Sequence, residues 1–441
     1  MLMSLQLIYG PSGSGKSYTL YKKIIEQSIR EPDREFIVIV PEQFTMQTQR
    51  ELVELHPNRG ILNIDVQSFL RLAWRIFEEV GVDTHTVLED TGKNLLLRRV
   101  ASRQKNDLTV LGRNFRKPGY ISQVKSIISE LKQYDVSLEE LDEQLRSGKK
   151  DALSYKLQDI RNLYEGFQEE LQGKYITSEE ILEELCYVVK KSEILKGCVV
   201  ALDGFTGFTP IQNKLLRELM QTAEKIYVTV TLDAWEDPMK KVSMHKLSYL
   251  SKKTIQQLAG AAKECGCMLE KPEVLGKEGS IRFRSAPALR FLERHLFRPG
   301  NQIYEAQDSQ KLERELSLHV ARDAKAEAEF AARTIWHLVR EENLRYRDIA
   351  VITGDMESFG DHMKKELQQK GIPCFIDRTR KLLLNPLVEF LRAALQIAAK
   401  SFRYESMFRY LRTGLAGLKK DEIGRLENYV LANGINSRRR W

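Results

Sequence analysis

The residues best suited to chemistry stand near the start of the chain, in the run Gly10-Pro11-Ser12-Gly13-Ser14-Gly15-Lys16-Ser17. The spacing Gly-x-x-x-x-Gly-Lys-Ser lets successive backbone N–H groups and a helix N-terminus wrap a chain of phosphates, and the glycines permit the close approach. In such a loop, Lys16 reaches the β- and γ-phosphates and the Ser17 hydroxyl ligates magnesium. We therefore expect the chain to bind the triphosphate of a purine nucleotide, ATP with Mg²⁺.

A second chemical group stands at the end of the apolar run Val199-Val200-Ala201-Leu202-Asp203. A buried strand that ends in an acid places a carboxylate beside the magnesium ion of a phosphate loop, so we expect Asp203 on the magnesium side of the site. In motor ATPases the next residue is a glutamate that orients or deprotonates the attacking water, whereas here it is Gly204. The site is therefore expected to hold ATP with weak or no hydrolysis, unless Glu42 or another carboxylate takes that role.

Aromatic and basic side chains are interleaved on a predicted helix over residues 69–79. Spacing of i, i+3, i+4, i+7 and i+8 predicts a core stripe, which consists of Phe69, Leu72, Ala73, Ile76 and Phe77. Arg71, Trp74 and Arg75 lie off that stripe. An indole and two guanidiniums outside the core can stack on unpaired bases and neutralise phosphates, but a tryptophan packed against a neighbouring domain fits this helix equally well.

Two further loops are expected at the sheet edge where ligands bind in open α/β folds. Phe205 and Phe208 follow Asp203; one of them is expected in the core, and either could stack on a base. Gln43 and Thr45 follow the second strand and offer hydrogen-bonding groups, although an ordinary loop before a helix has the same sequence.

The elements that must position these residues alternate between strands and helices, which predicts a parallel sheet. Short apolar runs predict strands at residues 5–9, 36–40, 61–66, 198–203 and 226–232. Between them, residues 91–190 show only helical periodicity, which indicates a helical domain inserted into one α/β domain.

A connector and a second α/β unit follow, with strands expected at 316–321 and 349–353 and a helical run after Pro386. The expected organisation is a first α/β domain in two parts (1–90 and 191–285), the insertion (91–190), a connector (286–315) and an incomplete second α/β domain that runs into a helical insertion (316–441).

Composition is that of a globular protein, with 42% hydrophobic and 29% charged residues, and its 441 residues suggest two to three domains. No signal peptide pattern and no apolar run near the roughly 20 residues of a membrane span are present, so we expect a cytoplasmic protein without a membrane partner. The net charge of +8 permits a polyanionic partner without requiring one.

The five cysteines are odd in number and scattered, which argues against a disulfide framework and for a reducing compartment. They are Cys186, Cys198, Cys265, Cys267 and Cys374. The pair Cys265-Gly266-Cys267 has no second pair at metal-ligand spacing, so we interpret it as structural.

These motifs together resemble the superfamily-one DNA helicases, and more closely the AddB (RexB) subunits of bacterial AddAB helicase-nucleases. The residues that carry the resemblance are 10–17, 40–45 (Val-Pro-Glu-Gln-Phe-Thr), 68–75 (Ser-Phe-Leu-Arg-Leu-Ala-Trp-Arg) and 203–205 (Asp-Gly-Phe). Residues 322–377 resemble the start of the second motor domain. The resemblance thus spans essentially the whole chain and implies two RecA-like domains, the first of them a P-loop NTPase domain.

The resemblance also implies partners and a function. In that family an AddA subunit supplies the active motor of a heterodimer that acts on duplex and single-stranded DNA in double-strand break repair by homologous recombination. AddB holds the 3′-ended strand and scans it for the hotspot Chi. The implied Chi-reading groups are Gln43, Thr45, Phe69, Arg71, Trp74 and one of Phe205 or Phe208, which requires Phe69 to be exposed at the start of its helix.

One departure from the family is large. Its nuclease acids and the four cysteines of its iron-sulphur cluster belong to a distant C-terminal part, so we expect neither activity nor cluster in this chain, which we interpret as an N-terminal fragment. An active helicase or translocase is an alternative, and a P-loop kinase or ATPase acting on a small molecule is a third.

Overall fold

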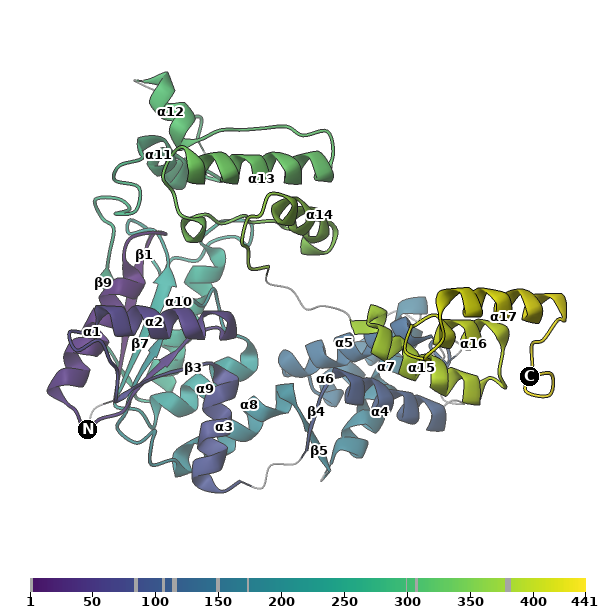
Figure 1. Ribbon diagram of the computed structural model, residues 1–441. Helices are drawn as coiled ribbons and strands as arrows, with labels where there is room; N and C mark the ends of the chain where they lie inside the picture. Colours follow the sequence, from purple (N-terminus) through teal and green to yellow (C-terminus); the bar gives the residue numbers. More distant parts are fainter. Residues whose placement is uncertain are drawn as a thin grey trace. The chain divides into compact units, whose positions relative to one another are not determined.

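A computed structural model describes residues 3–82, 86–104, 108–112, 117–147, 151–172, 174–298, 300–305, 308–376 and 382–441. The chain forms two compact units, Met1–Ser317 and Leu318–Trp441 (Figure 1). Each unit is described by itself.

The first unit is built on a seven-stranded sheet in which every recorded strand pair is parallel. Its order is β3-β2-β6-β7-β1-β8, and β9 also pairs with β1. The strands are β1 (Ser4–Gly10), β2 (Phe36–Ile39), β3 (Ile64–Gln67), β6 (Val199–Leu202), β7 (Lys225–Thr231), β8 (Met268–Leu269) and β9 (Glu273–Val274). The predicted α/β class with a parallel sheet is confirmed. The third strand starts later than predicted, because Leu62 is fully exposed and pairing begins at Ile64.

Helices cover both faces of this sheet (Figure 1). One face carries α1 (Lys16–Arg30) and α2 (Thr45–Leu55); the other carries α3 (Phe69–Val80), α8 (Ser178–Val188), α9 (Pro210–Met220) and α10 (Tyr249–Glu264). Successive residues of a strand point to opposite faces, so Phe36 and Val38 enter the first core while Ile37 and Ile39 enter the second. This double burial explains why the strands are continuously apolar rather than alternating.

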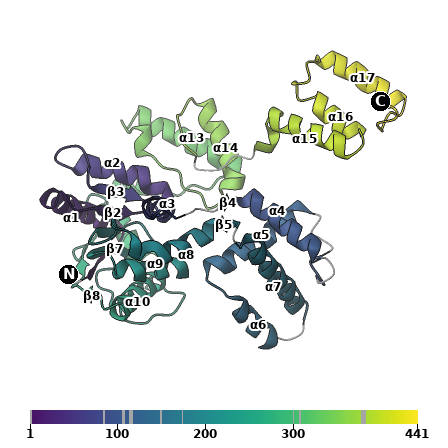
Figure 2. The same ribbon diagram turned by 90° about the horizontal axis from the view of Figure 1, so that it is seen from below.

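The helical part of the first unit forms a bundle (Figure 2), which has a hydrophobic core of its own. It consists of α4 (Asp90–Arg103), α5 (Pro118–Gln133), α6 (Leu138–Ser147) and α7 (Ala152–Leu171). The chain enters it through β4 (Thr86–Leu88) and leaves through β5 (Tyr175–Thr177), and these two strands pair in parallel. Helix α8 belongs to the sheet's core, although the sequence places residues 178–190 inside the insertion.

The remaining elements are helical. They are α11 (Pro287–His295) and α12 (Ser309–Glu315) in the first unit, and α13 (Ala324–Arg340), α14 (Met356–Gln369), α15 (Pro386–Ala399), α16 (Tyr404–Leu411) and α17 (Lys420–Ala432) in the second; short 3₁₀ turns lie at Glu42–Phe44, Val189–Lys191, Tyr346–Asp348 and Leu382–Leu384. In the described part of the chain, no helix is both long and apolar enough to cross a membrane.

The strands expected at 316–321 and 349–353 are not formed. Leu318, Val320 and Ile352 are 92%, 95% and 94% exposed, and no strand is assigned among the described residues of the second unit. A strand needs a partner for its backbone N–H and C=O groups, and neither segment has one here. A second RecA-like domain therefore stays a proposal, and Asp377, the last residue of the segment that resembles it, lies outside the described residues.

Candidate nucleotide site and nucleic-acid interface

All the predicted site segments lie at one edge of the sheet, where the parallel strands end. The predicted phosphate loop, residues 10–17, follows β1; we keep this name for it below. Residues 41–45 follow β2, α3 follows β3 and residues 203–208 follow β6. Because parallel strands end together, four stretches far apart in sequence are brought to the same edge.

The loop between β1 and α1 has the conformation that its glycines allow. Gly13 and Gly15 have φ of 73° and 89°, in the left-handed region that favours glycine. Helix α1 begins directly after Gly15 with no side-chain cap, which leaves its first N–H groups available to an anion. In this loop Gly10, Pro11 and Ser14 are buried, Gly13, Gly15, Lys16 and Ser17 are partly buried, and Ser12 is exposed.

Lys16 lies against its own loop, with Nζ donating to the carbonyl oxygens of Gly10 (3.1 Å) and Pro11 (2.9 Å). Burial lowers the pKa of Lys16 to about 8, while the charge of Asp203 acts in the opposite direction. The buried Ser14 hydroxyl has no hydrogen-bond partner among the described residues. Free donors, an uncapped helix and a partly buried cation fit a phosphate group.

The lowered pKa predicts a pH dependence of nucleotide binding. In the free protein Lys16 loses its proton at about pH 8, whereas a bound triphosphate favours the charged lysine. The affinity should therefore be level below pH 7 and fall about tenfold between pH 7 and 9, since each pH unit above the pKa costs one factor of ten. Titration of a fluorescent ATP analogue checks this. Lys16→Arg keeps its charge and should give a level profile; the same decline in that variant would contradict the assignment.

Asp203 is buried and held by hydroxyl groups. Tyr21 Oη donates to its Oδ2 (2.7 Å), and Thr229 Oγ1 donates to its Oδ1. Thr48 Oγ1 is 3.3 Å from Tyr21 Oη, and burial together with the charge of Asp203 raises the pKa of Tyr21 well above its ordinary value. A carboxylate has about four lone-pair positions, so after these two hydrogen bonds Asp203 still has lone pairs that can coordinate a metal ion.

The magnesium role predicted for Ser17 and Asp203 stays a prediction. These two residues are not hydrogen-bonded to each other, and the described residues contain no group of three or more His, Cys, Asp or Glu that could hold a metal ion by itself. The chemistry of a hydroxyl and a carboxylate suits Mg²⁺ that is shared with substrate phosphates.

Gly204 has a backbone that explains its identity. Its φ is 78°, which is the left-handed region, and a residue with a side chain would be strained there. Motor ATPases have a glutamate at this position. Here the backbone conformation favours glycine over a residue with a side chain. Glu42, the other candidate for that role, accepts a hydrogen bond from Arg71 instead.

Three phenylalanines form one cluster beside this loop. Ring centroids are 5.4 Å apart for Phe69–Phe205, 6.5 Å for Phe69–Phe208 and 5.2 Å for Phe205–Phe208. Phe69 is only 6% exposed, so the predicted core stripe of α3 is confirmed and the exposure of Phe69 that the family resemblance implied is wrong. The reason is that the two loop rings cover it. Both loop rings are partly buried and pack against the core of the sheet, so neither is the fully buried residue that was expected.

Arg71 and Trp74 lie on the outer side of α3, as predicted. The helix begins after Ser68, whose hydroxyl accepts from the Arg71 backbone N–H. Trp74 is 38% exposed as a residue, and its ring is edge-on to Phe77. The Arg71 side chain is 54% exposed, with Nε 2.9 Å from Glu42 Oε1. Arg75 differs, because it forms ion pairs with Asp65 on β3 and with Glu35, the residue before β2.

The two hydrogen-bonding groups predicted after β2 differ in accessibility. Gln43 is exposed. Thr45 is 4% exposed and its hydroxyl donates to the Glu42 carbonyl at the start of α2, so its side chain is not presented to a ligand. Its position at the helix start accounts for this local bond.

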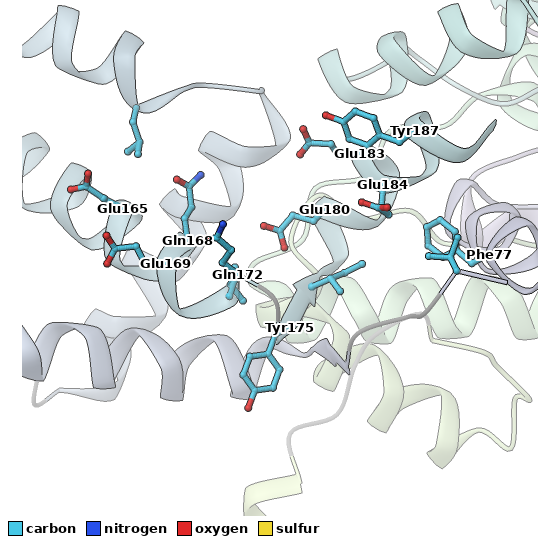
Figure 3. Close-up of a pocket in the computed structure, with 14 residues that line it drawn as sticks. Phe77, Glu165, Gln168, Glu169, Gln172, Tyr175, Glu180, Glu183, Glu184 and Tyr187 are labelled. Carbon is cyan, nitrogen blue, oxygen red and sulfur yellow. The ribbon is translucent and has the colours of Figure 1, made fainter. Parts of the chain in front are cut away.

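A cavity of about 670 Å³ elsewhere in the first unit is lined by negative charge, in contrast to the phosphate loop with its lysine (Figure 3). Its acidic lining comes from α7 and α8 and consists of Glu165, Glu169, Glu180, Glu183 and Glu184. Five carboxylates in one cavity repel phosphates, so this cavity fits neither a nucleotide nor DNA.

A family model described as "ADDB, N-terminal" matches residues 7–293. The chain belongs to the AddB family. Proteins named as the B-type subunits of ATP-dependent helicase/deoxyribonucleases are similar over its whole length: that of Lachnoclostridium phytofermentans is 46% identical over 444 residues, covering 100% of this chain, and that of Clostridium novyi is 35% identical over 440 residues, also covering 100%. This AddB-family chain spans 38% of the length of each of these two curated relatives.

Sequence reasoning missed several groups at this candidate site of the AddB-family chain. Tyr21 and Thr229 hold Asp203, and residues 275–284 pack on the phosphate loop. A tyrosine one turn into α1 gave no signal beyond helical spacing. Residues 275–284 did carry a signal, because they contain two glycines and two arginines directly after a strand.

Proposed function

We propose that this chain is the ATP-binding, single-stranded-DNA-binding part of a helicase-nuclease subunit that works with an AddA-type partner. In this proposal the partner unwinds duplex DNA for double-strand break repair by homologous recombination, and this subunit holds the 3′-ended strand and recognises Chi. The first domain is RecA-like, and the protein is cytoplasmic. We propose the domain boundaries expected from the sequence, except that α8 is counted with the first α/β domain because it packs in the core of the sheet.

The observation that carries this proposal is the loop after β6, which contacts both the predicted nucleotide site and the start of the predicted DNA-binding helix. Asp203 joins the hydroxyl network beside the phosphate loop. Phe205 and Phe208, a few residues further on, pack on Phe69 at the start of the helix that presents Arg71 and Trp74. A change at the phosphates can therefore reach the DNA surface through one short segment.

The site supports nucleotide holding better than hydrolysis. Lys16 would contact the β- and γ-phosphates, and Ser17 and Asp203 would hold Mg²⁺. The magnesium neutralises phosphate charge when bound. Gly204 supplies no group to orient water, so turnover should be weak or absent. Nuclease activity and an iron-sulphur cluster are not expected from these residues.

A binding experiment tests the proposal against its two rivals. Fluorescence anisotropy of a labelled 20-nucleotide single strand should show affinity that falls steeply with salt, because Lys and Arg contacts release counterions. A small-molecule kinase would show no such affinity. An active helicase would instead show ATP turnover that DNA stimulates, and that result would overturn the holding role.

The ion pair between Arg71 and Glu42 gives a specific prediction. Both side chains are about half exposed, so the pair is weak in water, but Glu42 competes with a phosphate for the guanidinium. Glu42→Gln should therefore raise single-strand affinity about threefold at 0.1 M salt, which corresponds to an exposed ion pair of under about 1 kcal/mol. Glu51→Gln, on α2, is the control. Unchanged or weakened binding in Glu42→Gln would exclude Arg71 as a phosphate contact.

A further inference from the structure

Residues 275–284, which we call the strap, lie against the phosphate loop. The Leu275 N–H donates to the Tyr9 carbonyl (2.8 Å), and the Arg282 N–H donates to the Gly13 carbonyl (3.2 Å). A Cβ at Gly13 would come within 2.6 Å of Ser280 Oγ and 2.7 Å of Arg282 Cβ. A side chain at position 13 would therefore clash with the strap, in addition to straining a backbone conformation that favours glycine.

The strap is fixed from its other side by α11. The Arg290 guanidinium donates to the Glu278 carbonyl, and a Cβ at Gly279 would meet the same guanidinium. Gly276 and Gly279 have φ of 75° and 104°, which lets the segment turn tightly over the loop. The position of the strap is thus determined by contacts with two elements.

Two buried hydroxyl groups at this junction lack partners. Ser14 and Ser280 are each 3% exposed, and neither Oγ has a hydrogen-bond partner in the described part of the chain. Buried polar groups are almost always hydrogen-bonded in native proteins, so this unpartnered pair offers two hydroxyl donors to an anion bound beside the loop.

The charges at the junction point to an anion. Arg282 is exposed and, among the residues that the structure describes, forms no ion pair, while the hydrogen bonds of Lys16 Nζ go to the Gly10 and Pro11 carbonyl oxygens. The Arg282 charge contributes to lowering the pKa of Lys16, so the two cations lie close enough to repel each other. An anion between them would relieve that repulsion.

We propose that the strap is the second wall of the phosphate site and that Arg282 contacts the terminal phosphate of a bound triphosphate. This inference rests on the proposed nucleotide site. Lys16 in this motif faces the β- and γ-phosphates, so a cation beside it meets the same end of the phosphate chain. A diphosphate lacks that group, and Arg282 thereby distinguishes the two nucleotides.

The test compares the affinities of the unaltered chain and three variants for magnesium-ATPγS and for ADP. Arg282→Ala should weaken magnesium-ATPγS about tenfold and ADP less than about twofold, because a charged hydrogen bond to the terminal phosphate is lost only in the first case. Arg282→Lys should recover part of the difference. Arg284→Ala, exposed on the same strap, should match the wild type.

The outcomes separate the two proposals. Equal effects of Arg282→Ala on both nucleotides, or no effect on either, would overturn the role of Arg282 and leave the nucleotide site standing. Failure of the unaltered chain to bind either nucleotide would overturn both.

Discussion

Replacing Lys16 with alanine should lower the affinity for magnesium-ATP on the order of 100-fold, because it removes a charged hydrogen bond of about 3 kcal/mol to the phosphates. The fold should survive, since the hydrogen bonds of Lys16 Nζ within the described part of the chain go to two carbonyl oxygens of its own loop. Calorimetric titration with ATP measures the affinity, and thermal unfolding without nucleotide checks the fold.

Lys22→Ala is the matched control for this change. Lys22 lies on the same helix, its side chain is 63% exposed, and its contact with Glu26 is long at 4.0 Å. Its removal should leave ATP affinity within twofold, consistent with the small contribution of surface ion pairs. Equal affinities for the Lys16→Ala variant and the unaltered chain would rule out the phosphate loop as the nucleotide site.

Replacing Trp74 with alanine should weaken single-stranded DNA about 30-fold. Stacking of one base on an aromatic side chain contributes about 2 kcal/mol, and Trp74 is the indole on the outer side of α3. The salt dependence should stay unchanged, because the substitution removes no charge. Anisotropy titrations at two salt concentrations measure both quantities.

Tyr187→Ala controls for loss of an exposed ring. Tyr187 is 64% exposed on α8, but it lies beside the acidic cavity with Glu183 and Glu184 (Figure 3). Its removal should leave DNA binding unaltered. If Tyr187→Ala and Trp74→Ala weaken binding equally, the DNA surface is not the outer side of α3.

The sequence predicted the sheet and the segments at its edge because both depend on local patterns. Continuous apolar runs identify strands buried on two faces, and the glycine spacing before α1 identifies a phosphate loop without knowledge of the rest of the fold. The five-residue core stripe of α3 followed from helical periodicity in the same way, and all five residues are buried.

What the sequence did not predict depends on contacts between distant segments. Phe69 is buried by rings 136 and 139 positions later in the chain, and Arg71 pairs with an acid on another loop. The packing of Ser280 and Arg282 on Gly13 has no local signature either. The unformed strands at 316–321 and 349–353 show the converse, since an apolar run becomes a strand only when a neighbouring strand completes its hydrogen bonds.

The parallel pairing of β4 with β5 makes the helical insertion a removable module. Thr86 lies opposite Tyr175, so the chain returns to within about 4.8 Å, the spacing of paired strands, of the point where it left. A short glycine linker from Thr86 to Tyr175 should close that gap without moving the phosphate loop. Beyond this ribbon, ion pairs such as Lys93–Glu179 and Lys132–Glu180 join the bundle to α8. Deleting the helical insertion at this junction, or replacing it with another domain, should leave the nucleotide edge of the sheet in place.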